Sequence, residues 1–443
     1  MASTKLTRTP SSQGNLKKWT YSMWVKLSGI NTEYVLFHNY GENTSREVFA
    51  KIGNNNGTIE FALRYDGSYD GRLITNRLFR DPNAWYHFVF VCDTENSTSG
   101  DRLKIYVNGV RETSFSTETY PPQNAGTVFN TTHEHTIGSY GSGNYFDGIM
   151  SHIHMTDGQA YDASTFGSTD STTGEWKINA DPGISQANYG TNGFWILKDG
   201  NSVTDQSGNS NNYAVGGGTL TNTEDCPSVV FATLNPLYYA ASQYTLSQGN
   251  NSIVYATDSS RSAFGTIGMT DNLGKFYWEV KIVSDSNNKG AYGICDDLYP
   301  DIQETGAFID YSGGYGYFAN GQSYNGGTGS SFGNSITTGD IVGVALDMDN
   351  LKLYFSKNGT WQNSGDPTSG STGTGAAYTV AAGKTYFPAI RVRNGTNGAF
   401  NFGNGYFQTT AISSEGTNAS GIGKFEYDVP AGYTALSTKG LNE

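Results

Sequence analysis

Residues 351–359 read LKLYFSKNG, and a shorter form of the same phrase, LKIYVNG, occupies residues 103–109, about 250 positions earlier. In both copies apolar and polar side chains alternate, which is typical of a β-strand with one buried face. Each copy ends in an Asn-Gly pair, the pair that best tolerates the positive φ angles of a tight hairpin turn. The sequence therefore predicts a β-hairpin at both places.

Similar strand patterns surround both copies. The first half contains WTYSMWVKL, EYVLFHNY, TIEFALRY, AWYHFVFVCD, HTIGSY and FDGIMSHIHM, and the second contains GKFYWEVKI, KGAYGICD, GYGYFANGQSY, DIVGVALDMD, YFPAIRV and GAFNFG. Turn residues separate them at the spacing of an antiparallel sandwich, and no helical stripe exceeds about two turns. We predict an all-β fold of two tandem antiparallel β-sandwiches. The expected parts are a jelly roll at 1–165, an irregular elaboration and loop-rich connector at 166–226, and a second sandwich with a C-terminal strand at 227–443.

Composition and charge narrow the class of protein. The chain has 443 residues, with 57 Gly, 30 Tyr and only 15% charged residues, which suits short strands joined by long polar loops. A length of this size favours two or three domains. The formal net charge of −13, with no basic stripe, argues against binding to nucleic acid or to an anionic membrane surface.

The cysteines and the chain start bear on the compartment. Cys92, Cys226 and Cys295 are odd in number and far apart, which argues against a disulfide framework or a zinc ribbon. The first residues, MASTKLTRTPSSQGNLKKW, lack the apolar core of a signal peptide, and no run approaches transmembrane length. We therefore expect synthesis in a cytoplasm and no membrane insertion.

Ordered motifs in both halves resemble two known families. The second half resembles the SPRY (B30.2-like) domain through motifs that occur in the family's order, at 274–280, 314–317, 339–347, 353–359, 387–389 and 401–403. The first half resembles a LamG-like jelly roll of the concanavalin A superfamily through YSMWVKL, WYHFVFVCD, LKIYVNG and IGSYGSGNYFDGIMSHIHMTDG. Both families are two-sheet β-sandwiches, so the resemblance implies the same inward-facing hairpin in each half.

The pairing of the two domains, with connectors such as YGTNGFWI and FATLNPL, resembles virion proteins of tailed phages, particularly marine ones. The resemblance implies a structural or adsorption protein located on the virion, in contact with other virion proteins and with a host-surface glycan or protein. It also implies a homo-oligomer, with a trimer favoured. The chain enters the first sandwich almost at once, which favours a tail appendage or head-surface protein over a main tail fibre. The alternatives are a purely structural decoration or cementing protein, and a secreted lectin or glycan hydrolase with the same folds.

The sequence offers no convincing catalytic motif. Glucanases of the concanavalin A superfamily carry E-x-D-x-x-E, but the one E-x-D here, from Glu426 to Asp428, is followed by Val-Pro, and Glu279 stands alone. The GSSFG around Ser331 lacks the strand and helix of a nucleophile elbow, and AAGKT at 381–385 lacks the first glycine of a P-loop. We expect a protein that is not an enzyme.

Two histidine pairs suggest a metal site. His133 and His135, and His152 and His154, are spaced so that each pair shares one face of a strand. The LamG-like resemblance implies that these strands are neighbours, so the four imidazoles could bind Zn²⁺ or Fe²⁺. The alternative is that they are polar positions facing solvent.

Two aspartates suggest a second, weaker metal hypothesis. Asp347 and Asp349 flank a turn and could hold Ca²⁺, although a hairpin turn explains them equally well. Apart from these possible ions, we expect no cofactor.

Aromatic residues in or beside the glycine-rich segments of the second half suggest a ligand site. Exposed rings can stack on a sugar while Asn and Asp bond its hydroxyl groups, and the same loops could bind protein. The candidates are Tyr311, Tyr315, Tyr317, Tyr324 and Trp361. Because Tyr315 and Tyr317 share one face of a strand, the alternative is that part of this set points into the core.

Overall fold

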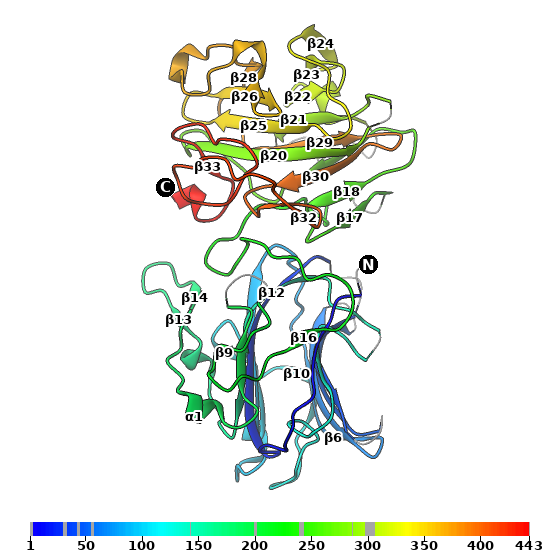
Figure 1. Cartoon of the computed structure of the whole chain (residues 1–443), viewed down its shortest axis with the longest axis vertical. Helices are drawn as coiled ribbons and strands as arrows, with labels where there is room; N and C mark the ends of the chain where they lie inside the picture. The colour runs from blue at the N-terminus through cyan, green and yellow to red at the C-terminus, as the bar shows by residue number, and fades with distance from the viewer. Residues whose placement is uncertain are drawn as a thin grey trace. The chain divides into compact units, whose positions relative to one another are not determined.

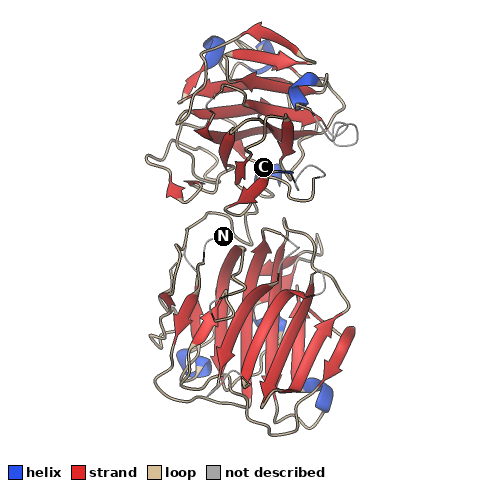
Figure 2. Cartoon of the chain, turned by 90° about the vertical axis from the view of Figure 1, so that its right-hand side faces the viewer, coloured by secondary structure: helices blue, strands red, loops and turns tan. Residues whose placement is uncertain are grey.

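The computed structural model describes residues 3–29, 33–41, 45–54, 57–141, 143–198, 202–238, 243–285, 287–296 and 306–442. It is nearly all-β, which confirms the predicted fold class (Figures 1 and 2). Contacts divide the chain into two compact units: unit 1 comprises residues 1–222 and 226–228, and unit 2 comprises 223–225 and 229–443. Among the described residues, no helix has the length and apolar character needed to cross a membrane.

Unit 1 consists mainly of two large antiparallel sheets. Sheet A has the order β10 (Phe115–Thr119), β6 (Ser68–Thr75), β5 (Thr58–Tyr65), β4 (Glu47–Asn54), β3 (Tyr34–Tyr40), β11 (His135–Ile137), β1 (Leu6–Arg8) and β16 (Ala214–Val215). Sheet B has the order β15 (Phe194–Ile196), β12 (Gly148–Asp157), β2 (Lys18–Leu27), β7 (Trp85–Asp93), β8 (Leu103–Val107) and β9 (Val110–Arg111).

The core of unit 1 contains aromatic residues from both sheets. Tyr21 of β2 stacks on Phe37 of β3 with ring centroids 4.2 Å apart, and Trp19 meets Phe61 edge to face at 5.8 Å. All four side chains are at most 1% exposed. Burying a large apolar side chain is worth about 2 kcal/mol, so these alternating positions fix which face of each strand points inward.

The segment interpreted as an elaboration and linker, 166–226, packs largely within unit 1. It provides β15 and β16 to the edges of the two sheets, and Tyr213 lies in the core. Residues 158–190, here called the flap, include β13 (Gly167–Thr169), β14 (Trp176–Ile178) and α1 (Gln186–Tyr189), and the flap covers the outer face of sheet B (Figure 1). The expected boundary near Cys226 falls within the stretch where the contacts divide the chain.

Unit 2 also has two large sheets. Sheet C has the order β17 (Thr245–Ser247), β18 (Ser252–Val254), β30 (Asn397–Asn401), β20 (Lys275–Ser284), β25 (Ile341–Asp347), β26 (Lys352–Lys357) and β27 (Thr360–Trp361), with β28 (Tyr378–Thr379) on β26 and β33 (Thr434–Ala435) on β20. Sheet D has the order β19 (Arg261–Phe264), β29 (Tyr386–Val392), β21 (Ala291–Asp296), β22 (Gly314–Phe318), β23 (Gln322–Asn325) and β24 (Thr328–Ser331).

Short elements complete the two units. A small hairpin, β31 (Tyr406–Phe407) with β32 (Thr410–Ala411), lies in the C-terminal strap, the name used here for residues 404–431. The 3-10 helices include η1 (Ser99–Asp101), η2 (Ala163–Thr165), η5 (Phe308–Asp310), η6 (Gln362–Ser364), η7 (Gly370–Thr372) and η8 (Gly440–Asn442).

The repeated phrase forms the two predicted hairpins. LKIYV is β8, which turns through Asn108 into β9, and KLYFSK is β26, which turns through Asn358 into β27. Both asparagines have positive φ, at 46° and 49°. Each side-chain oxygen accepts a hydrogen bond from the neighbouring strand, from His87 N at 2.7 Å and from Ile341 N at 2.8 Å. The strand order β12-β2-β7-β8-β9 of sheet B therefore has a counterpart in β30-β20-β25-β26-β27 of sheet C.

Candidate functional site

The outer faces of the two sheets of unit 1 differ. The flap packs on sheet B, where Phe166 and Trp176 join Val89 and Val91 in a small apolar cluster. In Figure 2 the central strands of sheet A face the viewer, and none of the other described segments lies in front of them. Among the described residues, no segment therefore covers the outer face of sheet A in the way that the flap covers sheet B.

Three rows of side chains cross this face, because residues paired between antiparallel strands lie directly opposite one another. Successive rows are two residues apart, about 7 Å along the strands. The first row is Tyr40, Glu47, Arg64 and Tyr69; the second is His38, Phe49, Ala62 and Arg72; the third includes Lys51 and Glu60.

Glu47 is a buried carboxylate of this face, at 1% exposure. Its oxygens bond Arg64 Nη1 at 3.0 Å and His38 Nε2 at 3.3 Å, and the Tyr140 hydroxyl donates a third hydrogen bond. Burial alone raises the pKa of Glu47, but the hydrogen bonds from His38, Tyr140 and Arg64 outweigh it and lower the pKa below its ordinary value. Glu47 is therefore a fixed anion that orients the groups around it.

Glu60, which is fully buried, plays the same part in the third row. It accepts from Arg72 Nε at 2.6 Å and lies 3.3 Å from Lys51 Nζ, which also pairs with Glu33 at 3.0 Å. Burial lowers the pKa of Lys51, but the two carboxylates raise it above its ordinary value. The cations of this face are thus held from below by buried acids.

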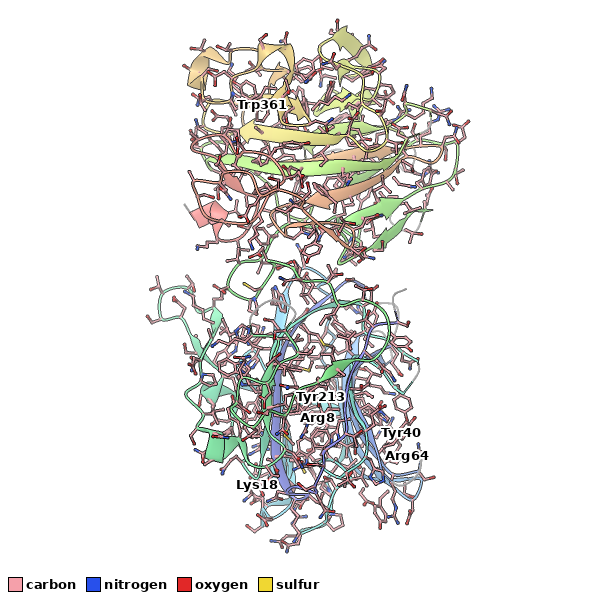
Figure 3. All side chains as sticks on the ribbon, viewed as in Figure 1. Arg8, Lys18, Tyr40, Arg64, Tyr213 and Trp361 are labelled. Atoms are coloured by element: carbon pink, nitrogen blue, oxygen red, sulfur yellow. The ribbon has the colours of Figure 1, made fainter. Side chains whose placement is uncertain are left out.

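Aromatic rings pack beside these cations. The Arg72 guanidinium lies 4.2 Å from the centroid of the Tyr69 ring, and the Arg64 guanidinium lies 5.8 Å from it. Across the sheet, the His38 ring lies 4.1 Å from that of Tyr40 and 4.3 Å from that of Tyr140. Figure 3 labels Tyr40 and Arg64, which lie on the same side of unit 1. The face can therefore recognise a ligand by stacking and by donated hydrogen bonds.

Sequence reasoning missed this face, although the strands contain a signal. In EVFAKIGN the polar residues Glu47 and Lys51 alternate with the buried Val48, Ala50 and Ile52, so one strand shows that its outer face is charged. Which charges meet across neighbouring strands depends on the register of those strands, and a single sequence does not give the register. Glu47 opposite Arg64 is one example.

The predicted aromatic site is not assembled in unit 2. Tyr315 and Tyr317 are 8% and 0% exposed and point into the core, as the alternative interpretation had it. Tyr311, which follows η5, and Tyr324, in β23 of sheet D, are half-buried, and the Tyr324 ring lies 5.1 Å from that of Phe318. Strand alternation turns two of the five candidate rings inward, so the prediction that Tyr315 and Tyr317 contact a ligand is wrong.

Trp361, the fifth candidate, is half-buried in β27 of sheet C (Figure 3), whereas Tyr324 belongs to sheet D and Tyr311 directly follows η5. Its ring meets that of the buried Tyr277 edge to face at 6.4 Å. The indole therefore packs on the outer side of its own sheet and does not join the other candidates.

The four predicted metal ligands do not converge, so that prediction is wrong. His135 lies in β11 of sheet A, whereas His152 and His154 lie in β12 of sheet B. A bulge between Ser151 and His154, with φ of 45° at His152, breaks the period-two spacing on which the prediction relied. Among the described residues, no group of three or more His, Cys, Asp or Glu side chains is placed to hold a metal ion.

The histidines are instead bonded within the fold. The His135 ring accepts from Asn130 N at 3.0 Å and donates to the backbone oxygen of the half-buried His133 at 2.9 Å. The His154 ring bonds the Tyr189 hydroxyl at 2.8 Å. Burial lowers the pKa of His135 to about 3 and that of His154 well below its ordinary value, so both rings are neutral.

The acids near turns and near the chain end also have structural partners. Asp347 accepts from the backbone N of Asp349 and Asn350 at 3.0 and 2.9 Å, as a hairpin-turn residue does. Glu426 and Asp428 bond Ser413 and Thr417 within the strap. Ser331 is an exposed residue of β24, an edge strand with no helix after it.

Glu279 is fully buried beneath the C-terminal strap. It accepts from Glu426 N at 2.9 Å, Tyr427 N at 2.8 Å, Tyr277 Oη at 3.1 Å and Asn401 Nδ2 at 3.2 Å. Burial raises its pKa to about 7, although these hydrogen bonds act in the opposite direction. Glu279 therefore holds the strap against sheet C through these hydrogen bonds.

Comparisons with protein families agree with this architecture. Residues 2–160 match the family model of the concanavalin A-like lectin/glucanases superfamily, and residues 275–405 match that of the SPRY domain. The chain thus carries a concanavalin A-like domain of LamG-like type followed by a SPRY domain.

Individual relatives match only parts of the chain. The dual specificity protein kinase splA of Dictyostelium discoideum is 28% identical over 130 residues, which is 27% of this chain and 5% of that protein. The SPRY domain of human HERC1 is 17% identical with a TM-score of 0.28, covering 38% of this chain and 96% of that one. Domain 4 of AbnA, a GH43 extracellular arabinanase from Geobacillus stearothermophilus in complex with arabinotriose, is 16% identical with a TM-score of 0.27, covering 35% and 67%. Likenesses this low do not bear on function.

Proposed function

We propose that this chain is a non-catalytic recognition protein of a tailed-phage particle, a tail appendage or head-surface protein that binds a host-surface glycan during adsorption through the outer face of sheet A. The observation that carries the proposal is the uncovered face on which buried Glu47 and Glu60 hold the half-exposed Arg64 and Arg72 in fixed positions. The virion setting is supported by the sequence resemblance described above.

The ionic composition of the face favours binding over a purely structural role. Removing a carboxylate from water costs several kcal/mol, and buried ion pairs often contribute little net stability. Glu47 and Glu60 are nevertheless almost inaccessible, while Arg64 and Arg72 keep 33% and 27% of their side chains exposed. A surface whose only task is solubility does not need buried carboxylates beneath its cations. A recognition surface gains affinity from them, because hydrogen-bond donors that are already fixed lose less entropy on binding.

The spacing of the acids supports a non-catalytic role. Glu47 and Glu60 lie in the first and third rows, about 13 Å apart along the strands, whereas glycoside hydrolysis uses carboxyl groups about 5–10 Å apart. Both acids are also bound to cations, and Glu279 lies under the strap. This arrangement suits a protein that binds a glycan without cutting it.

A binding measurement on whole cells tests the proposal. The full chain should bind susceptible host cells saturably, and a polysaccharide extract of the same cells should compete. The variant Tyr69→Ala, which removes an exposed ring, should lower binding about tenfold, since a stacking contact contributes up to about 1.5 kcal/mol. Equal binding by wild type and variant would place recognition elsewhere. Localisation of the chain by immunogold on particles tests the virion setting separately.

A further inference from the structure

We infer that the glycan bound on the outer face of sheet A bears carboxylate groups, which the guanidinium groups of Arg64 and Arg72 receive. This inference rests on the proposed function and names its ligand class.

The solvent-facing polar atoms are mainly hydrogen-bond donors. The side chains of Arg64, Arg72 and Lys51 are 33%, 27% and 16% exposed, whereas those of Glu47 and Glu60 are 1% and 0% exposed. In the Arg64–Glu47 and Arg72–Glu60 pairs the negative charge lies beneath the positive charge, whereas Lys51 also pairs with Glu33, whose side chain is 31% exposed. A ligand that approaches this face therefore meets N–H groups first, and must itself be rich in acceptors.

Each of the two arginines has nitrogen atoms that make no hydrogen bond to the described residues. Among the hydrogen bonds of the described residues, Arg72 donates through Nε to Glu60, and Arg64 donates through Nε to Gly67 O and through Nη1 to Glu47. Among the described residues, no hydrogen bond uses Nη2 of Arg64 or either Nη group of Arg72, so these groups can donate to a ligand. A planar guanidinium matches a carboxylate through two parallel hydrogen bonds.

Tyr69 holds the guanidinium of Arg72 in place. At 4.2 Å from the ring centroid, the cation lies over the ring face, which leaves its in-plane N–H bonds directed away from the ring. Glu60 also binds Nε of this guanidinium, so the Arg72 side chain has little conformational entropy left to lose when a ligand binds. Tyr69 is thus a positioning residue for Arg72 as well as an exposed contact.

The form of the face fits an extended saccharide. The rows run over four strands, from β3 to β6, a width of about 14 Å, and none of the described segments lies in front of these strands in Figure 2. A flat surface of this width binds several units of a chain more readily than one small molecule.

The test compares one polymer in two forms. Binding of the full chain to oligogalacturonate is measured beside binding to the same oligomer after carboxyl reduction. A panel of other uronate and sialate saccharides, a sulfated polysaccharide and polyglutamate complete the set. Wild type should bind at least one carboxylated saccharide, and reduction of its carboxyl groups should weaken binding at least tenfold, since a charge-assisted hydrogen bond contributes about 1.5–3 kcal/mol. Added salt should also weaken binding.

Two variants and a matched control locate the site. Arg72→Lys keeps the charge and the pairing with Glu60 but removes the planar fork, and should weaken binding about tenfold, as should Tyr69→Ala. Tyr65→Ala is the control: Tyr65 belongs to the same hairpin and is 41% exposed against 39% for Tyr69. Because Arg64 pairs with Tyr69 and Tyr65 pairs with Ser68, Tyr65 points to the other side of the strand. This control should leave binding unchanged, and unchanged thermal unfolding of all variants confirms that they fold.

The outcomes separate this inference from the proposed function. Equal binding of reduced and unreduced saccharide, with loss in Tyr69→Ala, would overturn the carboxylate assignment and leave glycan recognition on sheet A intact. Binding that follows charge alone, with the sulfated polymer or polyglutamate bound as tightly, would also overturn it, as would no binding to any carboxylated saccharide of the panel. Glycan binding indifferent to both variants would overturn the inference and the proposed function together.

Discussion

Sheets B and C share one design but bury opposite titratable groups. In each sheet the Asn-Gly hairpin that follows the repeated phrase is covered by a later segment, which places an aromatic ring against the turn glycine: Trp176 of the flap on Gly109, and Tyr427 of the strap on Gly359. Beneath the flap the histidines His87 and His154 are buried, and His87 bonds the ring that covers the turn, whereas beneath the strap the buried carboxyl is that of Glu279.

The two covering segments are held by different hydrogen bonds: the flap by a side-chain bond to His87, and the strap by backbone bonds to Glu279. The neutral His87 ring accepts from Trp176 Nε1 at 3.0 Å through Nδ1 and bonds Ser22 Oγ at 2.9 Å through Nε2. Glu279 instead accepts two backbone N–H groups of the strap. Burial lowers the pKa of His87 to about 3 and raises that of Glu279 to about 7. The two units should therefore respond to pH with opposite sign.

The largest effect is expected for His87. Its pKa in the folded chain lies below its ordinary value of 6.5, so the stability contributed by the neutral ring is present above pH 6.5 and is lost as pH falls toward 3. The loss amounts to about 5 kcal/mol at most. Hydrogen exchange of β7 and β8 in the full chain should show protection falling over this window, and His87→Gln should flatten that part of the profile. An unchanged profile in the variant would contradict the assignment.

Glu279 should act in the opposite direction and slightly less strongly. Because its folded pKa, about 7, lies above the ordinary 4.5, its contribution to stability is present below pH 4.5 and is lost as pH rises through 7. The change is about 3 kcal/mol at most. Hydrogen exchange of β20 and the strap should show protection falling as pH rises, and Glu279→Gln should remove this dependence.

The exposed Glu415 of the strap provides the control for Glu279. Because the Glu415 side chain faces solvent, Glu415→Gln should leave the pH profile of the strap unchanged. If Glu415→Gln and Glu279→Gln alter the profile equally, the response belongs to the surface charge of the strap and the comparison with His87 fails.

The turn glycines should be equivalent in the two units. Gly109 and Gly359 have φ of 82° and 78°, and a Cβ at either position would collide with the covering ring. Gly109→Ala and Gly359→Ala should each lower the free energy of unfolding of their own unit by about 2 kcal/mol, from backbone strain and a displaced ring. Chemical denaturation followed by hydrogen exchange assigns each loss to its unit. A large effect in one unit and none in the other would show that only one turn is clamped.

The smallest effect is expected for the turn asparagines. Asn108 and Asn358 each bond the backbone of the neighbouring strand, at His87 N and Ile341 N. Asn108→Ala and Asn358→Ala should each cost about 1 kcal/mol, since a backbone N–H loses its partner. Denaturation midpoints of the two variants measure the loss, and a midpoint equal to that of wild type would contradict the shared hairpin design.

Strands with strong local signals were predictable from the sequence, and strands defined by distant partners were not. The hairpins at 103–109 and 351–359 follow from alternation and the Asn-Gly pairs, which are local. The two-residue strand β16 exists only because β1 offers it an edge, about 200 residues away in sequence. A pattern of two residues has no periodicity to detect, so 166–226 read as a linker.

The candidate site shows the same limit. The inward direction of Tyr315 and Tyr317 was available from period-two alternation, and it outweighed their aromatic character. The bulge at His152 was not available, because a single left-handed residue shifts the register without altering composition. Prediction of the charged face of sheet A depends on the register that places Glu47 opposite Arg64 and Glu60 opposite Lys51.

The measurement that tests the central claim most directly exposes the intact host-surface polysaccharide to the full chain and records binding and newly formed reducing ends in the same sample. The account predicts saturable binding that falls about tenfold in Tyr69→Ala and Arg72→Lys but not in Tyr65→Ala, with no reducing ends released. Release of reducing ends, or binding that all three variants leave untouched, would contradict it.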